Sequence, residues 1–148
     1  MGWTSNLIES PDQVADILRS SKTVAVVGIK EAPFEPAFYV PQYLQQQGYR
    51  IIPVNPKFKR VLGAPCLASL LEIQVPVDIV EVFRAPQNVM PHAQEALQLK
   101  PKVFWMQDGI EHPQAARLLA EAGIRVVQNR CMLRDYANLV VSARVPTR

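Results

Sequence analysis

The sequence predicts an α/β fold in which a parallel sheet is covered by helices on both faces. Five short stretches of apolar, mostly β-branched residues alternate with stretches that have the spacing of amphipathic helices. The connections between them are short, which is typical of a doubly wound sheet. With 148 residues and 49% hydrophobic content, the chain can fill the core of one such domain, which we expect to span residues 1–148.

Residues 23–27, Thr-Val-Ala-Val-Val, form the first predicted strand. A run this rich in β-branched residues is typical of the centre of a parallel sheet. Ahead of it, Ser10 and Pro11 predict the start of a helix, because serine caps helices and proline suits the first helical position. After it, a loop at residues 30–36 leads to a second helix, in which Pro41 is tolerated only in the first turn.

The remaining elements continue the alternation of strand and helix. Strands are predicted at residues 50–54, 77–83, 102–106 and 125–128. Helices are predicted to open at Ala85-Pro86 and at His112-Pro113, with a short helix at residues 67–73 and last helical turns near residues 133–139. Residues 61–65 are predicted to be irregular.

Numbered along the chain, the five predicted strands are expected in the order 3-2-1-4-5, as in a Rossmann-like fold with right-handed crossovers. The first strand is then central, and the fourth lies beside it. The loops after Val27, Val54, Phe83 and Met106 are expected to face one crevice. Open α/β sheets bind ligands at the carboxyl ends of their strands, so this crevice is the predicted ligand site.

The composition excludes several classes of protein. No apolar run approaches the roughly 18 residues of a membrane span, and the first residues lack the basic and apolar parts of a secretory signal. The net charge of +3 comes from 16 basic and 13 acidic residues spread along the chain, which does not indicate nucleic-acid binding. Cys66 and Cys131 are too few for a disulfide scaffold or a four-thiolate zinc site. We therefore expect a cytoplasmic protein with reduced thiols that binds neither nucleic acid nor a membrane.

The loop after the first strand lacks a full dinucleotide fingerprint. Such a fingerprint needs glycines at three set spacings, whereas Gly28 stands alone before Ile29 and Lys30. At the end of the second strand an acidic residue would hold the ribose 2′-hydroxyl of NAD, but this chain has Asn55-Pro56-Lys57. A lysine there favours an adenosine whose ribose carries its own phosphate. NADP and coenzyme A both fit that description.

Four segments resemble a known family. They are Val26-Val27-Gly28, the stretch Gly-Tyr-Arg-Ile-Ile-Pro-Val-Asn-Pro-Lys at residues 48–57, Val-Asp-Ile-Val-Glu-Val-Phe-Arg at residues 77–84, and Asn129-Arg130-Cys131-Met132. Together they look like the small, single-domain coenzyme A-binding proteins, a family similar to the nucleotide-binding domain at the start of the succinyl-CoA synthetase α subunit. The resemblance covers about residues 23–139, and residues 48–57 are its most specific motif. After Gly28 the family usually has small residues such as Ala-Ser, where this chain has Ile29 and Lys30.

The resemblance implies that the ligand is coenzyme A or an acyl-CoA, and it implies a set of residues around the crevice. These are Gly28, Ile29 and Lys30 at the diphosphate, Asn55, Pro56 and Lys57 after Val54 at the adenosine, Phe83 and Arg84 beside the nucleotide, and Gln107 to Gly109 at the pantetheine arm. Lys57 would supply positive charge to the 3′-phosphate.

No catalytic or metal-binding set emerges from the sequence. His92 lies in a predicted helix and His112 just before another, and neither has a carboxylate at a spacing that would orient it. Cys66 and Cys131 are expected to be small buried residues, although Cys131 follows the last strand on the ligand side. The leading interpretation is a module that binds coenzyme A or an acyl-CoA without catalytic machinery of its own.

Two other interpretations stay open. One is an enzyme, either an NADP-dependent reductase or an acyl-CoA transferase that acts through Cys131. The other is a regulatory or partner domain, such as a stand-alone piece of a CoA ligase, which would associate with a larger protein subunit.

Overall fold

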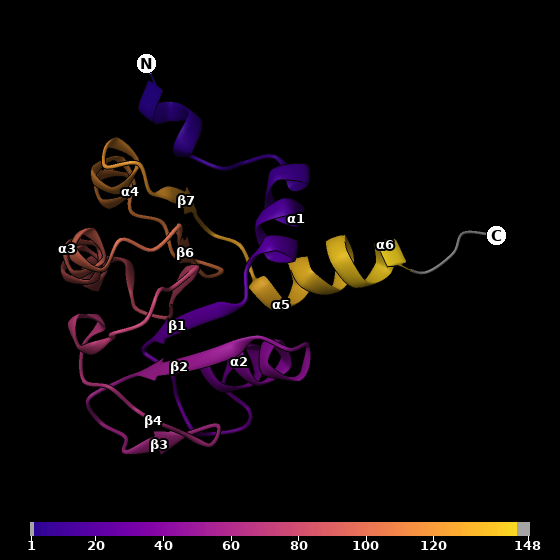
Figure 1. Cartoon of the computed structure of the whole chain (residues 1–148), viewed down its shortest axis with the longest axis vertical. Coiled ribbons are helices and arrows are strands. Elements are labelled where there is room, and N and C mark those ends of the chain that lie inside the picture. The colour runs from indigo at the N-terminus through magenta and orange to yellow at the C-terminus, as the bar shows by residue number, and fades with distance from the viewer. Residues whose placement is uncertain (1, 145–148) are drawn as a thin grey trace.

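Five parallel strands form one sheet in the computed structural model, which describes residues 2–144. The strands are β1 (Thr23–Val27), β2 (Arg50–Val54), β5 (Ile79–Val82), β6 (Val103–Met106) and β7 (Arg125–Val127), and they lie in the order β2-β1-β5-β6-β7 (Figure 1). All four pairings are parallel. The doubly wound α/β fold is thereby confirmed.

The expected strand order 3-2-1-4-5 is wrong. Numbered along the chain, the five strands have the order 2-1-3-4-5, because β5 pairs with β1 instead of lying outside β2. Pro53 gives the physical reason. The carbonyl oxygen of Pro53 accepts from the Leu67 N–H on the outer side of β2, so its ring nitrogen also faces outward, where it has no hydrogen to donate to a further strand. The switch point of the sheet therefore lies between β1 and β5.

The outer edge of β2 is covered by the chain that follows it. Leu67 makes a parallel bridge with Val54, and the backbone N–H of Asn55 donates to its carbonyl oxygen. Between Asn55 and Leu67 the chain forms a small hairpin of β3 (Arg60–Val61) and β4 (Ala64–Pro65). The sequence predicted residues 61–65 to be irregular. The helix predicted at residues 67–73 is only the 3-10 turn η2 (Leu70–Glu72).

Helices cover both faces of the sheet, as predicted (Figure 1). On one face lie α1 (Pro11–Ser20), α2 (Pro36–Gln46) and the C-terminal segment, made of α5 (Met132–Asp135), the π-helical η4 (Tyr136–Val141) and α6 (Ser142–Arg144). On the other lie η2, α3 (Met90–Leu99) and α4 (Pro113–Glu121), with η3 (Pro86–Asn88) leading into α3 and η1 (Gly2–Asn6) packed on α4. No helix within residues 2–144 is long and apolar enough to cross a membrane.

Alternate residues of each strand belong to two hydrophobic cores, one on each face of the sheet. Val27 and Val82 point towards α3 and α4, whereas Val26 and Trp105 point towards α1, α2 and the C-terminal segment. Glu81 is in register with Val26 on one side and Trp105 on the other, and it is completely buried. Neither of its carboxyl oxygens has a hydrogen-bond partner within the described chain. Its burial raises the pKa of Glu81 to about 8.

Pro41 lies in the second turn of α2, not in the first turn where the sequence led us to expect it. A proline there cannot donate to the carbonyl oxygen four residues earlier, which belongs to Ala37. That oxygen instead accepts from the backbone N–H of Lys30 at 3.2 Å. The Ala37 carbonyl, which has no donor within the helix, thus binds the loop after β1 to α2.

Candidate functional site

Two cavities open at the carboxyl ends of the strands. The larger cavity, of about 490 Å³, is bounded by the start of α2 and by the chain after β5, β6 and β7, and Lys30, Tyr39, Arg84, Gln107 and Cys131 are among its lining residues. The smaller cavity, of about 20 Å³, lies at the ends of β1 and β2 beside α3. Arg84 lines both. The larger one has the volume of a typical small-molecule site.

The predicted site residues divide between the cavities. Lys30, Phe83, Arg84, Gln107 and Gly109 line the larger one, whereas Gly28, Val54, Asn55, Pro56 and Arg84 line the smaller one. Ile29 and Lys57 line neither. The structure therefore brings most of the set to one end of the sheet but separates it into two parts that meet at Arg84.

Gly28 lets the end of β1 approach the end of β5. Its φ of +80° is in the left-handed region, and a Cβ added there would lie 2.4 Å from the carbonyl oxygen of Phe83. The Gly28 N–H donates to the Val54 carbonyl, and the Phe83 N–H donates to that of Val27. Only glycine fits at this junction of three strand ends.

Asn55 joins the loops that follow β1 and β2. Its Nδ2 donates to the Ile29 carbonyl at 2.8 Å, and its Oδ1 accepts from the Lys57 N–H at 2.9 Å. The Ile29 side chain is fully buried in the core beneath α2, so this residue offers only its backbone to the crevice. The Lys57 side chain is exposed, which suits a contact with a phosphate outside the cavity.

The floor of the larger cavity is fixed by contacts with the C-terminal segment. The Oε1 of Gln107, a buried residue, accepts from the Met132 N–H at 3.2 Å, next to Cys131 at the cavity wall. Asp108 receives two hydrogen bonds of 2.8 Å from the guanidinium of Arg134. These bonds, with the nearby charge of Arg134, hold the pKa of Asp108 below its usual range.

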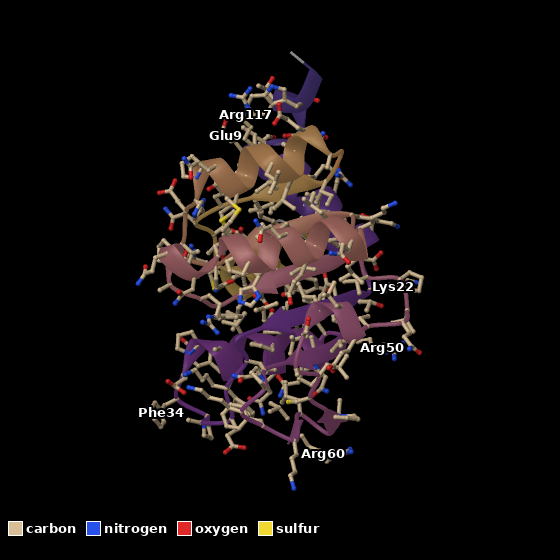
Figure 2. All side chains as sticks on the ribbon, turned by 90° about the vertical axis from the view of Figure 1, so that its left-hand side faces the viewer. Glu9, Lys22, Phe34, Arg50, Arg60 and Arg117 are labelled. Atoms are coloured by element: carbon tan, nitrogen blue, oxygen red, sulfur yellow. The ribbon has the colours of Figure 1, made fainter. Side chains whose placement is uncertain are left out.

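Basic side chains lie around the crevice, together with Glu35 and Asp108 in the larger cavity and Glu95 in the smaller one. Arg84 is half-buried and has no hydrogen-bonded or ion-paired partner in the part of the chain that the structure describes. Lys30 lines the larger cavity, and Lys57, Lys59 and Arg60 follow β2 as an exposed run. Figure 2 shows Phe34, in the loop after β1, on the opposite side of the molecule from Lys22 and Arg50, which mark the amino ends of β1 and β2. The positive charge at the crevice suits an anionic ligand.

The histidines differ from the sequence-based expectation in one respect. His112 is the N-cap of α4, and its Nδ1 accepts from the Ala115 N–H at 3.1 Å. His92 does have an orienting carboxylate, because Glu95 one helical turn later lies 3.1 Å from its Nδ1. The i, i+3 spacing on a helix was the signal in the sequence. We found no group of three or more metal-binding side chains within residues 2–144.

The chain is similar to a known protein family and to several individual proteins. Residues 22–137 match the family described as CoA binding domain. An uncharacterised protein of Bacillus subtilis, YneT, is 38% identical over 123 residues, which cover 83% of this chain and 91% of that protein. A solved structure from Thermus thermophilus, ID.343, has 44% identity and a TM-score of 0.85, covering 88% of this chain and 99% of that one. ADP-forming acetate–CoA ligase II of Archaeoglobus fulgidus is 33% identical over 72 residues, 47% of this chain but only 10% of the ligase.

Proposed function

Because the chain belongs to the CoA-binding domain family, we propose that it binds coenzyme A or an acyl-CoA in the crevice at the carboxyl ends of β1, β2 and β5. The observation that carries the proposal is the position of Arg84. It lines both cavities, and no side chain of the described residues forms a hydrogen bond or an ion pair with it. An elongated anion that occupies the larger cavity and reaches the mouth of the smaller one would therefore meet an unpaired positive charge at its middle.

The ligand's parts have complementary surfaces along this path. The nucleotide end would lie near Asn55 and Pro56, with the exposed Lys57 beside the ribose 3′-phosphate. The diphosphate would lie between Gly28, Lys30 and Arg84, where backbone and basic side chains can donate hydrogen bonds to phosphate oxygens. The pantetheine arm, which is less polar, would follow the larger cavity towards Gln107 and Cys131.

Calorimetry with coenzyme A, dephospho-coenzyme A and NADP tests this assignment. We expect coenzyme A to bind more tightly than dephospho-coenzyme A, and Lys57→Ala to reduce that difference. Lys22→Ala is the matched control, because Lys22 is exposed at the opposite ends of the strands. Equal affinity for the first two ligands would remove the role of Lys57, and binding of NADP alone would overturn the whole proposal.

A second candidate function is acyl transfer, and the position of Cys131 favours it. Cys131 is partly exposed in the wall of the larger cavity, beside the Gln107 side chain. Its thiol sulfur would attack the thioester carbonyl of an acyl-CoA, forming a Cys131 thioester and releasing coenzyme A as its thiol. Mass spectrometry of the protein with acetyl-CoA would show a 42 Da adduct on Cys131; an unmodified thiol at saturating ligand would exclude this function. Cys66 serves as the internal control, because burial raises the pKa of its thiol and it lines neither cavity.

A further inference from the structure

Three side chains form a hydrogen-bonded chain in the wall of the smaller cavity. The Ser69 hydroxyl donates to Glu95 Oε2 at 2.6 Å, and Glu95 Oε1 lies 3.1 Å from His92 Nδ1. Ser69 also caps η2, since its oxygen accepts from the Leu71 N–H at 3.0 Å. The side chains of His92 and Glu95 are 20% and 24% exposed. Both oxygens of the carboxylate are therefore used, and the imidazole ring is held in one orientation.

This chain of contacts fixes which nitrogen of His92 is available. A carboxylate accepts hydrogen bonds, so the hydrogen between the two groups belongs to Nδ1. Nε2 is then the free nitrogen, and no described residue pairs with it. It accepts a hydrogen bond when the ring is neutral and donates one when the ring is protonated.

An anion bound beside His92 would lie among charges of both signs. Within the smaller cavity the charged groups are Glu95 from α3 and Arg84 after β5, while the chain after β1 and β2 contributes the uncharged Gly28 and Asn55. An anion next to the Glu95 carboxylate would be repelled unless a positive charge lay between them. A protonated His92 supplies that charge and a second donor beside Arg84.

We propose that His92 and Arg84 together bind the diphosphate of the nucleotide ligand, and that His92 takes up a proton as the ligand binds. Glu95, held by Ser69, is a positioning residue that keeps the ring oriented and stabilises its positive charge. The inference rests on the proposed function and adds to it a dependence on pH. Affinity decreases as the pH rises through the range in which histidine loses its proton.

Calorimetry in two buffers of different ionisation enthalpy measures this proton uptake directly. The wild type should take up part of a proton on binding coenzyme A near neutral pH, and its affinity should be about tenfold higher at about pH 6 than at about pH 8.5. His92→Asn keeps a donor for Glu95 but cannot be protonated, so it should lose both the proton uptake and the pH dependence. His112→Asn keeps the cap of α4 and should behave as the wild type.

Two further variants separate the roles of the neighbours. Arg84→Ala should weaken binding about tenfold at every pH while proton uptake persists, because the arginine remains charged throughout. Glu95→Gln should reduce the proton uptake. Its thermal unfolding temperature should change by no more than that of His92→Asn. Binding of coenzyme A without proton uptake by the wild type overturns this inference alone. No binding of coenzyme A at any pH overturns the proposed function and this inference with it.

Discussion

The side-chain amide of Asn55 donates a hydrogen bond to the carbonyl oxygen of Ile29, and the two atoms are 2.8 Å apart. This bond crosses from the loop after β2 to the loop after β1. Asn55 is only 8% exposed, so water does not compete freely for either partner. The two loops that border the smaller cavity are therefore positioned by one side chain.

Replacing Asn55 with alanine should affect both stability and ligand binding. The Ile29 carbonyl and the Lys57 N–H would each lose a partner, which should lower the free energy of unfolding by about 1–3 kcal/mol. Affinity for coenzyme A should fall as well, because the loops lose their fixed relation. Asn6→Ala is the control, since Asn6 donates to the Ala120 carbonyl far from the crevice. Urea unfolding measures the stability of Asn55→Ala and Asn6→Ala, and calorimetry measures their affinity for coenzyme A. Equal affinities in the two variants would contradict the prediction.

Gly28→Ala should be strongly destabilising. The new Cβ would lie 2.4 Å from the Phe83 carbonyl, and the positive φ adds strain of its own. We expect a loss of about 2–4 kcal/mol in the free energy of unfolding. Gly123→Ala has a similar φ of +87° but open space around its Cβ, so it should cost only about 1 kcal/mol. Equal losses in the two variants would mean that the close approach to Phe83 contributes nothing.

Glu81 should make the protein less stable as the pH rises. Its pKa is about 8 in the folded protein because of burial, above the ordinary value of 4.5, so the folded state holds a proton that the unfolded chain releases. The contribution of Glu81 to the free energy of unfolding is fully present below about pH 4.5. It decreases as the pH rises towards about 8 and does not change further above that pH.

Substitution of Glu81 removes this dependence. Glu81→Met should abolish that part of the pH profile and, at neutral pH, stabilise the fold by an amount on the order of a few kcal/mol. Glu9→Gln, at an exposed position that Figure 2 labels, should leave the profile unchanged. Chemical unfolding at a series of pH values measures both. A profile in the methionine variant with the slope of the wild type would contradict the prediction.

Pro41→Ala should loosen the loop after β1. The restored N–H would compete with that of Lys30 for the Ala37 carbonyl, since it lies four residues along the same helix. Hydrogen exchange at the Lys30 amide should become about five- to tenfold faster, which corresponds to a loss of about 1 kcal/mol. Unchanged exchange at Lys30 would show that the oxygen holds both donors equally well.

Local sequence patterns predicted the strands better than their arrangement. The boundaries of β1 and β2 match the predicted residues 23–27 and 50–54, because β-branched runs ended by glycine or Asn-Pro leave little freedom. The strand order was wrong because the handedness rule fixes the side of a crossover but not how many strands it passes. Pro53 carried the missing information, as a proline inside a strand indicates an edge.

For the candidate site, too, the sequence indicated which residues lie at one end of the sheet but not how they contact one another. Residues next to the ends of β1, β2, β5 and β6 could be assigned to one end of the sheet, since parallel strands end together. The contact between His92 and Glu95 was present in their spacing along one helix, but Ser69 lies 26 residues from Glu95 in the sequence and meets it only in the folded chain. The bond from Asn55 to Ile29 likewise depends on the register of β2 on β1, which no short motif specifies.

Both margins of the sheet are occupied by the protein's own chain. On the β2 side, Leu67 takes the backbone positions next to Pro53 and Asn55. On the β7 side, Leu7 forms a parallel bridge with Val126, and the Ile8 N–H donates to the Val126 carbonyl. A sheet with unprotected edges can recruit strands from neighbouring molecules and start aggregation. Here the proline and the two short flanking segments occupy the backbone positions at which a further strand would have to pair.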